Sequence, residues 1–535
     1  MKRREFLKKY ASIGGAALIV PGCSSLRKTS SADSEKFNVH PFIRKNPDAV
    51  FIHFTDVNSK TDTADIRQAG YKLSQELMVK SPDGYSMTAK VNIKPNWTSA
   101  SPVNGKPVFE KLGVNTDPNF IEGWVAAMKE LGPQRYFIRE CCCPVQWEPM
   151  GWAAMAQRNN IDLRDLSTMD VWTLKEGKDL IFRKIPNGVI FKEVAYMAPM
   201  NEPGSCLINI AKLKAHGMGI TSAIKNLQGI TAKRFHQFCT LYSDIRKQTP
   251  PRYLPYFKKD LEKHIEALYA KHLKDGIPRW DRPGGDGGIW QESWVNRALD
   301  NLSVTHAELH MVEGIYSQDG NGFGSGPYEK LGQTDVTSRD YMSNVVIFGK
   351  DPFRVDIIAH WLAGHEPGNF GLFHIGIERK MSNVLDPADI PLFVWKDGQS
   401  TPAKLENLKR TPLVTYYLQR DYNGQTEPRF HLCNEPFDYS AWKTKRASAE
   451  RPSIENLGLD NVGRVNLSLT LPEKERVGVT ILNSQGEVVG RLLDGDIDAG
   501  VHHVVWDNFN SPGLYTAYVK GMGWDAVREM PIYPS

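Results

Sequence analysis

The sequence has no long hydrophobic run after its first 23 residues. No apolar stretch there approaches the roughly 18 residues that a membrane-spanning helix needs. The chain also lacks a large net charge. Its 66 Lys and Arg residues nearly balance its 61 Asp and Glu residues, which leaves a formal net charge of +5 in 535 residues. So small an excess, spread along the chain, gives no case for a nucleic-acid partner. We therefore expect a mature protein that is soluble or tethered by a lipid.

Cysteine is scarce, and its seven residues show no C-x-x-C spacing and no ferredoxin-type iron–sulfur motif. Three of them, Cys141, Cys142 and Cys143, are adjacent, so their side chains diverge and cannot easily bind one metal ion. Packing of small apolar side chains at the end of a strand is one interpretation of this trio. A redox thiol or a contact to a soft metal is the other, and it keeps the three as candidate metal ligands. The spacing does not indicate which cysteines would pair in an oxidising compartment.

The first 23 residues have the features of an export signal. The segment KRREFLK at residues 2–8 contains paired arginines and resembles the twin-arginine signal, and a short apolar stretch follows it. Residues 20–23, VPGC, resemble a lipobox, which implies a lipid on Cys23. The twin-arginine route carries folded proteins, so we expect a periplasmic or other extracytoplasmic location with a membrane tether through this lipid. Residues 24–45 are Ser-rich at their start and predict a linker.

Strand and helix patterns alternate between residues 46 and 385, which predicts an α/β domain with a mostly parallel sheet. Helices are indicated by apolar residues at helical spacing, and strands by short apolar runs. Residues 233–290 interrupt the alternation and predict a helical insertion. The clearest elements are strands at residues 49–54, 89–93 and 135–139 and helices at residues 63–77, 119–131 and 290–302.

The stretch from Ser205 to Gly229 is the centre of this domain. It begins with an apolar run, residues 206–211, that predicts a buried strand. Lys212, Lys214 and His216 follow on alternate positions, so they point to one face while the backbone stays extended. Their charges would neutralise a carboxylate or phosphate, and the imidazole would transfer a proton or bind a metal ion.

A glycine turn and a short helix complete the stretch. Thr221 or Ser222 is the expected N-cap, and the first helical turn carries Lys225 and Asn226. Free N–H groups and the positive end of the helix dipole would make an anion site there. The alternative is an ordinary strand–loop–helix corner with solvated lysines, because the pattern is neither a Walker A loop nor a dinucleotide fingerprint.

A Lys-Pro-Asn segment ends the strand predicted at residues 89–93. Pro95 stops the strand and fixes the backbone. Lys94 and Asn96 are therefore candidate ligand contacts at the carboxyl end of a strand.

Three motifs lie in this domain: KLKAHGMGITSAIKNLQG at residues 212–229, HMVEGIYSQDGNGFGSGP at residues 310–327 and DPFRVD at residues 351–356. Together with the Lys-Pro-Asn segment they resemble the family known as domain of unknown function 362, or DUF362. The resemblance covers residues 49–381, with an insertion after Gly229. The family has no established reaction. The resemblance therefore implies a fold and the position of a site, but it does not indicate which reaction the site would catalyse.

The resemblance implies three further site residues. Glu313 stands where the family usually has Asp before a glycine, and we expect it to act with His216 and Lys225 in catalysis. The glycines around Asn321 would let this residue and backbone N–H groups approach a ligand, with an ordinary loop as the alternative. Asp356 begins a predicted helix, so it either caps that helix or contacts the ligand.

Short alternating strands separated by glycine-containing turns predict a small all-β sandwich at residues 458–530. This segment resembles the immunoglobulin-like domain of flagellar hook-capping proteins, which also occurs as an appendage on secreted bacterial enzymes. The resemblance implies an accessory module that contacts a protein partner and carries no catalysis. Residues 386–457 predict extra strands and a linker.

The favoured function is that of an exported enzyme that binds a small anionic or polar ligand, with a metal ion as an optional cofactor. A redox or electron-transfer accessory with a metal centre is one alternative, and a non-catalytic envelope binding protein is another. The sequence indicates neither the substrate nor whether a cofactor is present. The expected ligand contacts are Lys94, Asn96, Lys212, Lys214, Asn226, Asn321 and Asp356; the expected catalytic residues are His216, Lys225 and Glu313; the candidate metal ligands are His216 and the three adjacent cysteines.

Overall fold

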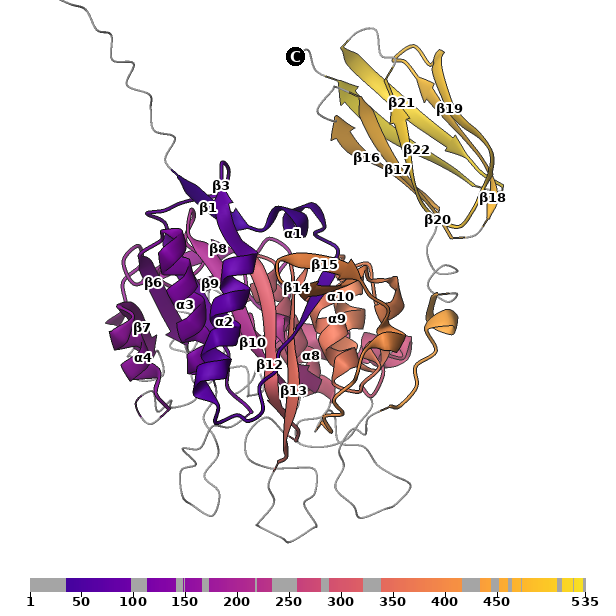
Figure 1. The fold of residues 1–535 in the computed structure, drawn as a ribbon. Helices are drawn as coiled ribbons and strands as arrows, with labels where there is room; N and C mark the ends of the chain where they lie inside the picture. The colour runs from indigo at the N-terminus through magenta and orange to yellow at the C-terminus, as the bar shows by residue number, and fades with distance from the viewer. Residues whose placement is uncertain are drawn as a thin grey trace, which may run out of the picture.

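A computed structural model gives the fold of the main domain and of a C-terminal domain (Figure 1). None of the described helices is both long and apolar enough to cross a membrane. The structure describes residues 35–97, 113–140, 148, 150–165, 173–216, 219–232, 257–280, 288–320, 338–415, 434–443, 452–459, 464–472, 474–507, 512–522 and 524–532.

A ten-stranded sheet forms the centre of the main domain. Its neighbouring pairs are parallel except those that involve β13 or β15, and the short β11 (Gly219–Thr221) folds back antiparallel on β10. The mostly parallel α/β class predicted from the sequence is therefore confirmed. The strand order is β15 (Gln399–Pro402), β14 (Leu392–Lys396), β2 (Val50–Phe54), β13 (Asp340–Gly349), β12 (Leu309–Gln318), β10 (Cys206–His216), β5 (Lys90–Pro95), β6 (Arg135–Glu140) and β7 (Ile161–Asp165).

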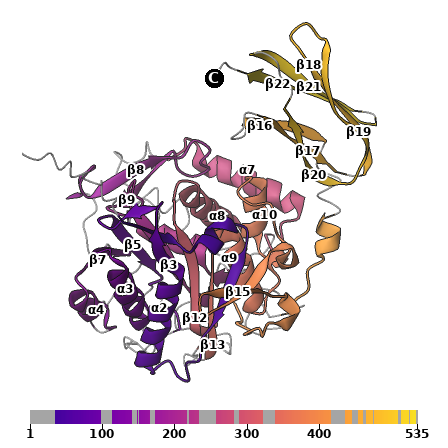
Figure 2. The same cartoon turned by 45° about the horizontal axis from the view of Figure 1, so that its top comes forward.

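Helices cover both faces of this sheet, and each face has its own hydrophobic core (Figures 1 and 2). One core contains residues of α2 (Thr63–Leu77), α3 (Pro118–Leu131) and α4 (Trp152–Arg158). The other contains residues of α5 (Ala223–Asn226), α7 (Leu261–Asp275), α8 (Gly288–Leu302), α9 (Pro352–Leu362) and α10 (Gly371–Glu378). A parallel sheet needs this double cover because its strands are apolar on both faces.

The central strand β10 is buried along its whole length. Cys206, Ile208 and Ile210 pack into the core with α2 and α3, while Leu207 and the alternate residues after it pack into the core with α5 and α8. The strand continues five residues beyond the apolar run that ends at position 211, so its last alternate residues, Lys212, Lys214 and His216, are polar and yet buried.

Part of the predicted N-terminal linker is structured. Residues Lys36–Val39 form β1, which pairs with β3 (Met78–Ser81) and β4 (Tyr85–Ser86), and Pro41–Lys45 form α1. The expectation of a linker through residue 45 is wrong here, because Phe37, Val39 and Ile43 are fully buried in the core beneath them.

The C-terminal region is all-β, as predicted. Two antiparallel sheets pack around a core of alternating apolar residues, among them Leu467, Val479 and Trp506. The first strand begins at Ser453, five residues before the expected start of the domain. One sheet is β16 (Ser453–Leu459), β17 (Val465–Leu471) and β20 (Gly500–Trp506); the other is β19 (Val488–Ile497), β18 (Glu475–Leu482), β21 (Gly513–Lys520) and β22 (Asp525–Ile532).

A buried histidine joins the helix α7, which lies in the predicted helical insertion, to α8 and α10. Nδ1 of His272 lies 2.6 Å from Glu292, and Nε2 lies 3.0 Å from Glu378. Burial acts to lower the pKa of His272, but the two carboxylates outweigh it and raise that pKa to about 9. The imidazolium form therefore holds the three helices together.

This junction predicts a loss of stability at alkaline pH. The pKa of His272 is about 9 in the folded state and 6.5 in the unfolded chain, so its stabilising contribution is full below pH 6.5 and disappears as the pH rises through 9. We expect it to amount to about 1–2 kcal/mol, because each pKa unit corresponds to about 1.4 kcal/mol and the partly exposed Glu378 is screened by solvent. Urea unfolding between pH 6 and 10 should show this slope in wild type and a flatter one in His272→Gln. Equal slopes would contradict the assignment.

Candidate functional site

Polar side chains form two rows across the middle of the sheet, one row on each face. On the face covered by α5 and α8, Lys94 of β5, Asn209 of β10 and His310 of β12 are direct neighbours in the strand register. On the face covered by α2 and α3, Lys212 of β10 is the neighbour of Glu313 of β12. The sequence hypothesis placed Lys94, Lys212 and Glu313 in one site, but the sheet separates the first from the other two.

Lys94 is the centre of the first row. Its ammonium group lies 2.5 Å from Oε2 of Glu140 and 3.0 Å from Oδ1 of Asn226. Asn226 also accepts a hydrogen bond from the side chain of Asn96 and donates one to Oδ1 of Asn209, at 3.2 and 2.8 Å. All five side chains are buried. The network brings together three of the predicted ligand contacts and fixes the carboxyl end of β5 against α5.

Lys212 and Glu313 form a fully buried ion pair in the second row, with both side chains at 0% exposure. The ammonium group lies 2.7 and 2.9 Å from the two carboxylate oxygens and 3.6 Å from the centre of the Tyr316 ring. Backbone N–H groups of Asp117 and Ile315 also donate to Glu313. Burial raises the pKa of Glu313, and the charge of Lys212 opposes that rise. These two residues therefore support each other within the core, so their geometry favours a structural role over ligand contact or catalysis.

The N-terminus of α5 is capped by Asp356 from α9. Its two carboxylate oxygens accept hydrogen bonds from the N–H groups of Ala223 and Ile224, at 2.7 and 3.0 Å. The expectation of free N–H groups for an anion at this helix is therefore wrong. Asp356 does not cap its own helix either, because α9 begins at Pro352 with Asp351 as its N-cap. Burial raises the pKa of Asp356 to about 8, against the effect of the two N–H donors.

His216 and Lys225 lie beside Trp294 of α8 near the carboxyl edge of the sheet, and the charge of Lys214 also acts on His216. The rings of His216 and Trp294 meet edge to face at 5.0 Å, and Nζ of Lys225 lies 5.3 Å from the centre of the Trp294 ring. Burial holds the pKa of His216 well below 6.5, and the positive charges of Lys225 and Lys214 lower it further. At neutral pH the imidazole is therefore uncharged.

The remaining predicted site residues, Asn321, Cys141, Cys142 and Cys143, lie outside the described part of the chain. Within the described part, no group of three or more His, Cys, Asp or Glu residues is arranged to hold a metal ion.

Sequence reasoning missed four residues that build these clusters: Glu140, Asn209, His310 and Trp294. Asn209 interrupts an apolar run, and a polar residue inside a buried strand is a usable signal for a network. Glu140 directly precedes the three cysteines, and a carboxylate at the carboxyl end of a strand is a second usable signal. Neither signal names a partner, because the partners come from distant parts of the chain.

The conserved-domain model described as domain of unknown function, DUF362, matches residues 91–360, which are 270 of the 535 residues and just over half of the chain. The chain belongs to the DUF362 family. The match begins in β5 and ends in α9, so both polar rows and the cluster beside Trp294 lie within the DUF362 segment. The strands β1 and β14 and the C-terminal sandwich lie outside it. No curated protein is significantly similar to the chain.

Proposed function

We propose that this DUF362 protein is an exported enzyme that binds a small anionic or polar molecule beside His216. The observation that carries the proposal is the placement of the buried His216 and of Lys225 against Trp294, where burial and the charges of Lys225 and Lys214 hold the pKa of His216 well below 6.5. The two ammonium groups would attract an anionic ligand, and its negative charge would raise the pKa of His216 toward the range in which an imidazole takes up a proton.

The neighbouring residues would have distinct roles in this site. Lys225 is half-buried, and with the buried Lys214 it would hold the negative charge of the ligand. Trp294 would orient His216 through their edge-to-face contact. The network of Lys94, Glu140 and Asn226 would position α5 and so Lys225.

The proposal includes export and an accessory domain. Export by the twin-arginine route is supported by the segment KRREFLK at residues 2–8, and a lipid anchor by the VPGC sequence that ends at Cys23. The antiparallel C-terminal sandwich supports an immunoglobulin-like module of the hook-capping type, which would contact a protein partner.

Calorimetric titration with phosphate and with oxalate tests the anion site. Lys225→Met is expected to weaken binding about tenfold or more, because a charge-assisted hydrogen bond contributes about 1.5–3 kcal/mol. Lys404→Met is the matched control, since it removes the same charge from a side chain that is 77% exposed. The proposal predicts that only the first change weakens binding. Equal affinities of the two variants, or no binding of either anion to wild type, would contradict it.

A further inference from the structure

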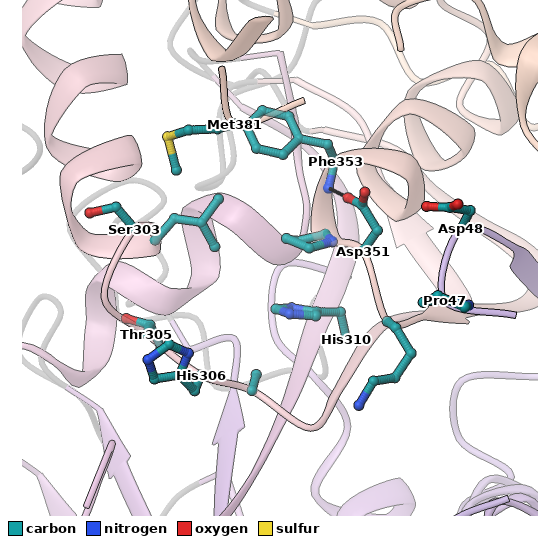
Figure 3. Close-up of a pocket in the computed structure, with 13 residues that line it drawn as sticks. Pro47, Asp48, Ser303, Thr305, His306, His310, Asp351, Phe353 and Met381 are labelled. Carbon is teal, nitrogen blue, oxygen red and sulfur yellow. Dashed lines mark hydrogen bonds between the residues drawn. The ribbon is translucent and has the colours of Figure 1, made fainter. Parts of the chain in front are cut away.

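A cavity lies at the amino edge of the central sheet, opposite the edge near His216 (Figure 3). Its volume is about 570 Å³, and it opens between the C-terminal end of α8, the start of β12 and the start of α9. Figure 3 shows His310 at the centre of this pocket, with Thr305 and His306 to one side and Asp351 to the other. The volume falls in the range typical of small-molecule sites.

His310 presents a hydrogen-bond donor to this pocket. Its side chain is 3% exposed, and Nδ1 lies 3.1 Å from Nδ2 of Asn209. The amide oxygen of Asn209 accepts from Asn226, which assigns Nδ2 as a donor and therefore Nδ1 of His310 as the acceptor. The proton of the neutral imidazole then lies on Nε2, for which the described residues provide no hydrogen-bond partner. Burial, with a smaller effect of Lys350, lowers the pKa of His310 to about 3, so the ring remains neutral.

The walls of the pocket combine apolar and acidic groups. Leu302, Phe353 and Met381 form an apolar side. Asp48, with a side chain that is 69% exposed, and Asp351 stand on the other side, and Nε of Arg354 lies 3.5 and 3.4 Å from their carboxylates. As the N-cap of α9, Asp351 also accepts hydrogen bonds from the N–H groups of Phe353 and Arg354.

The second cation, Lys350, is already paired with Glu308. The pocket therefore carries an excess of negative charge, which disfavours phosphate and other dianions.

We infer that this pocket is a binding site for a small primary amide on an apolar body. The amide carbonyl accepts the Nε2 proton of His310, and the amide NH₂ donates toward the carboxylates of Asp48 and Asp351. The apolar body contacts Leu302, Phe353 and Met381. This site is separate from the one proposed beside His216, because it lies at the other edge of the sheet.

Butyramide is the probe, with butyrate and phosphate as charge controls. In full-length protein labelled with ¹⁵N-histidine, the free His310 ring is expected to be neutral with its proton on Nε2. Butyramide should shift this signal at millimolar concentration, and butyrate should bind about tenfold more weakly because of the excess acidic charge. Phosphate should leave the signal unchanged.

Met381→Trp fills the pocket without touching the His310–Asn209 contact, and Met342→Trp adds the same side chain at another partly exposed methionine. The inference predicts that butyramide binding falls at least about tenfold in the first variant and is unchanged in the second. Two results would overturn it: a His310 signal that butyramide does not shift in wild type, or equal binding by wild type and Met381→Trp. A proton found on Nδ1 would overturn it independently of how the variants fold.

Discussion

Replacing Lys212 by methionine is expected to lower the free energy of unfolding by about 3–5 kcal/mol, because removal of one partner leaves a buried charge without compensation. The carboxylate of Glu313 is at 0% exposure, and among the described residues it would keep two backbone N–H donors. Methionine preserves most of the volume of lysine. The decrease in the free energy of unfolding therefore comes mainly from the unpaired charge of Glu313 and not from a cavity. Urea unfolding followed by tryptophan fluorescence measures it.

Two further variants separate this effect from general damage. The double variant Lys212→Met/Glu313→Gln removes both charges and should recover a large part of the loss, since the amide oxygen still accepts a backbone hydrogen bond. Lys72→Met breaks a surface pair whose side chains are 49% and 59% exposed, and should change stability by less than about 1 kcal/mol. A Lys212→Met protein as stable as Lys72→Met would contradict the assignment of a buried ion pair.

Gly229→Ala is expected to destabilise the main domain by about 1–3 kcal/mol, because an added methyl group has no room in a well-packed core. A Cβ atom at Gly229 would lie 2.1 Å from Oε1 of Glu140 and 2.6 Å from Cε of Lys94. The substitution therefore forces apart the buried pair that fixes the end of β5. Thermal or urea unfolding measures the loss.

Gly495→Ala is the control for this change, because a Cβ atom there meets no atom within 4 Å and its backbone conformation suits any residue. It should leave the unfolding of both domains near wild type. A Gly229→Ala protein that unfolds like wild type would contradict this prediction. It would show that the Lys94–Glu140 pair can move to make room for the added methyl group.

Much of the fold could be predicted from local pattern. The helix at residues 63–77 was predicted with the bounds of α2, because apolar residues at helical spacing mark its buried face. Hydrophobic alternation likewise located β17 and the all-β character of the C-terminal region. Local pattern failed where burial depends on a distant partner. Lys212 and Lys214 were expected to contact a ligand or to be solvated, yet Lys212 is buried against Glu313, 101 residues away.

The candidate site was predicted only in part for the same reason. Lys94 and Asn96 were singled out at a strand end and Asn226 in a first helical turn, and the three meet in one network. The role of Asp356 could not be predicted, because its carboxylate caps a helix 133 residues away in the chain. The redox alternative rests on the three adjacent cysteines, which lie outside the described residues, so it stays a prediction from the sequence.

The pKa of His216, measured by NMR titration of ¹⁵N-histidine protein with and without phosphate, tests the central claim most directly. The chain has 14 histidines, so a His216→Gln sample assigns the signal. The account predicts a pKa well below 6.5 in the free protein, because the site is buried and two lysines lie near it. It also predicts a rise in Lys225→Met and a rise on addition of phosphate, since each reduces the positive charge around the ring. A pKa of 6.5 or above in the free protein, or a value that phosphate does not change, would contradict an anion site at His216.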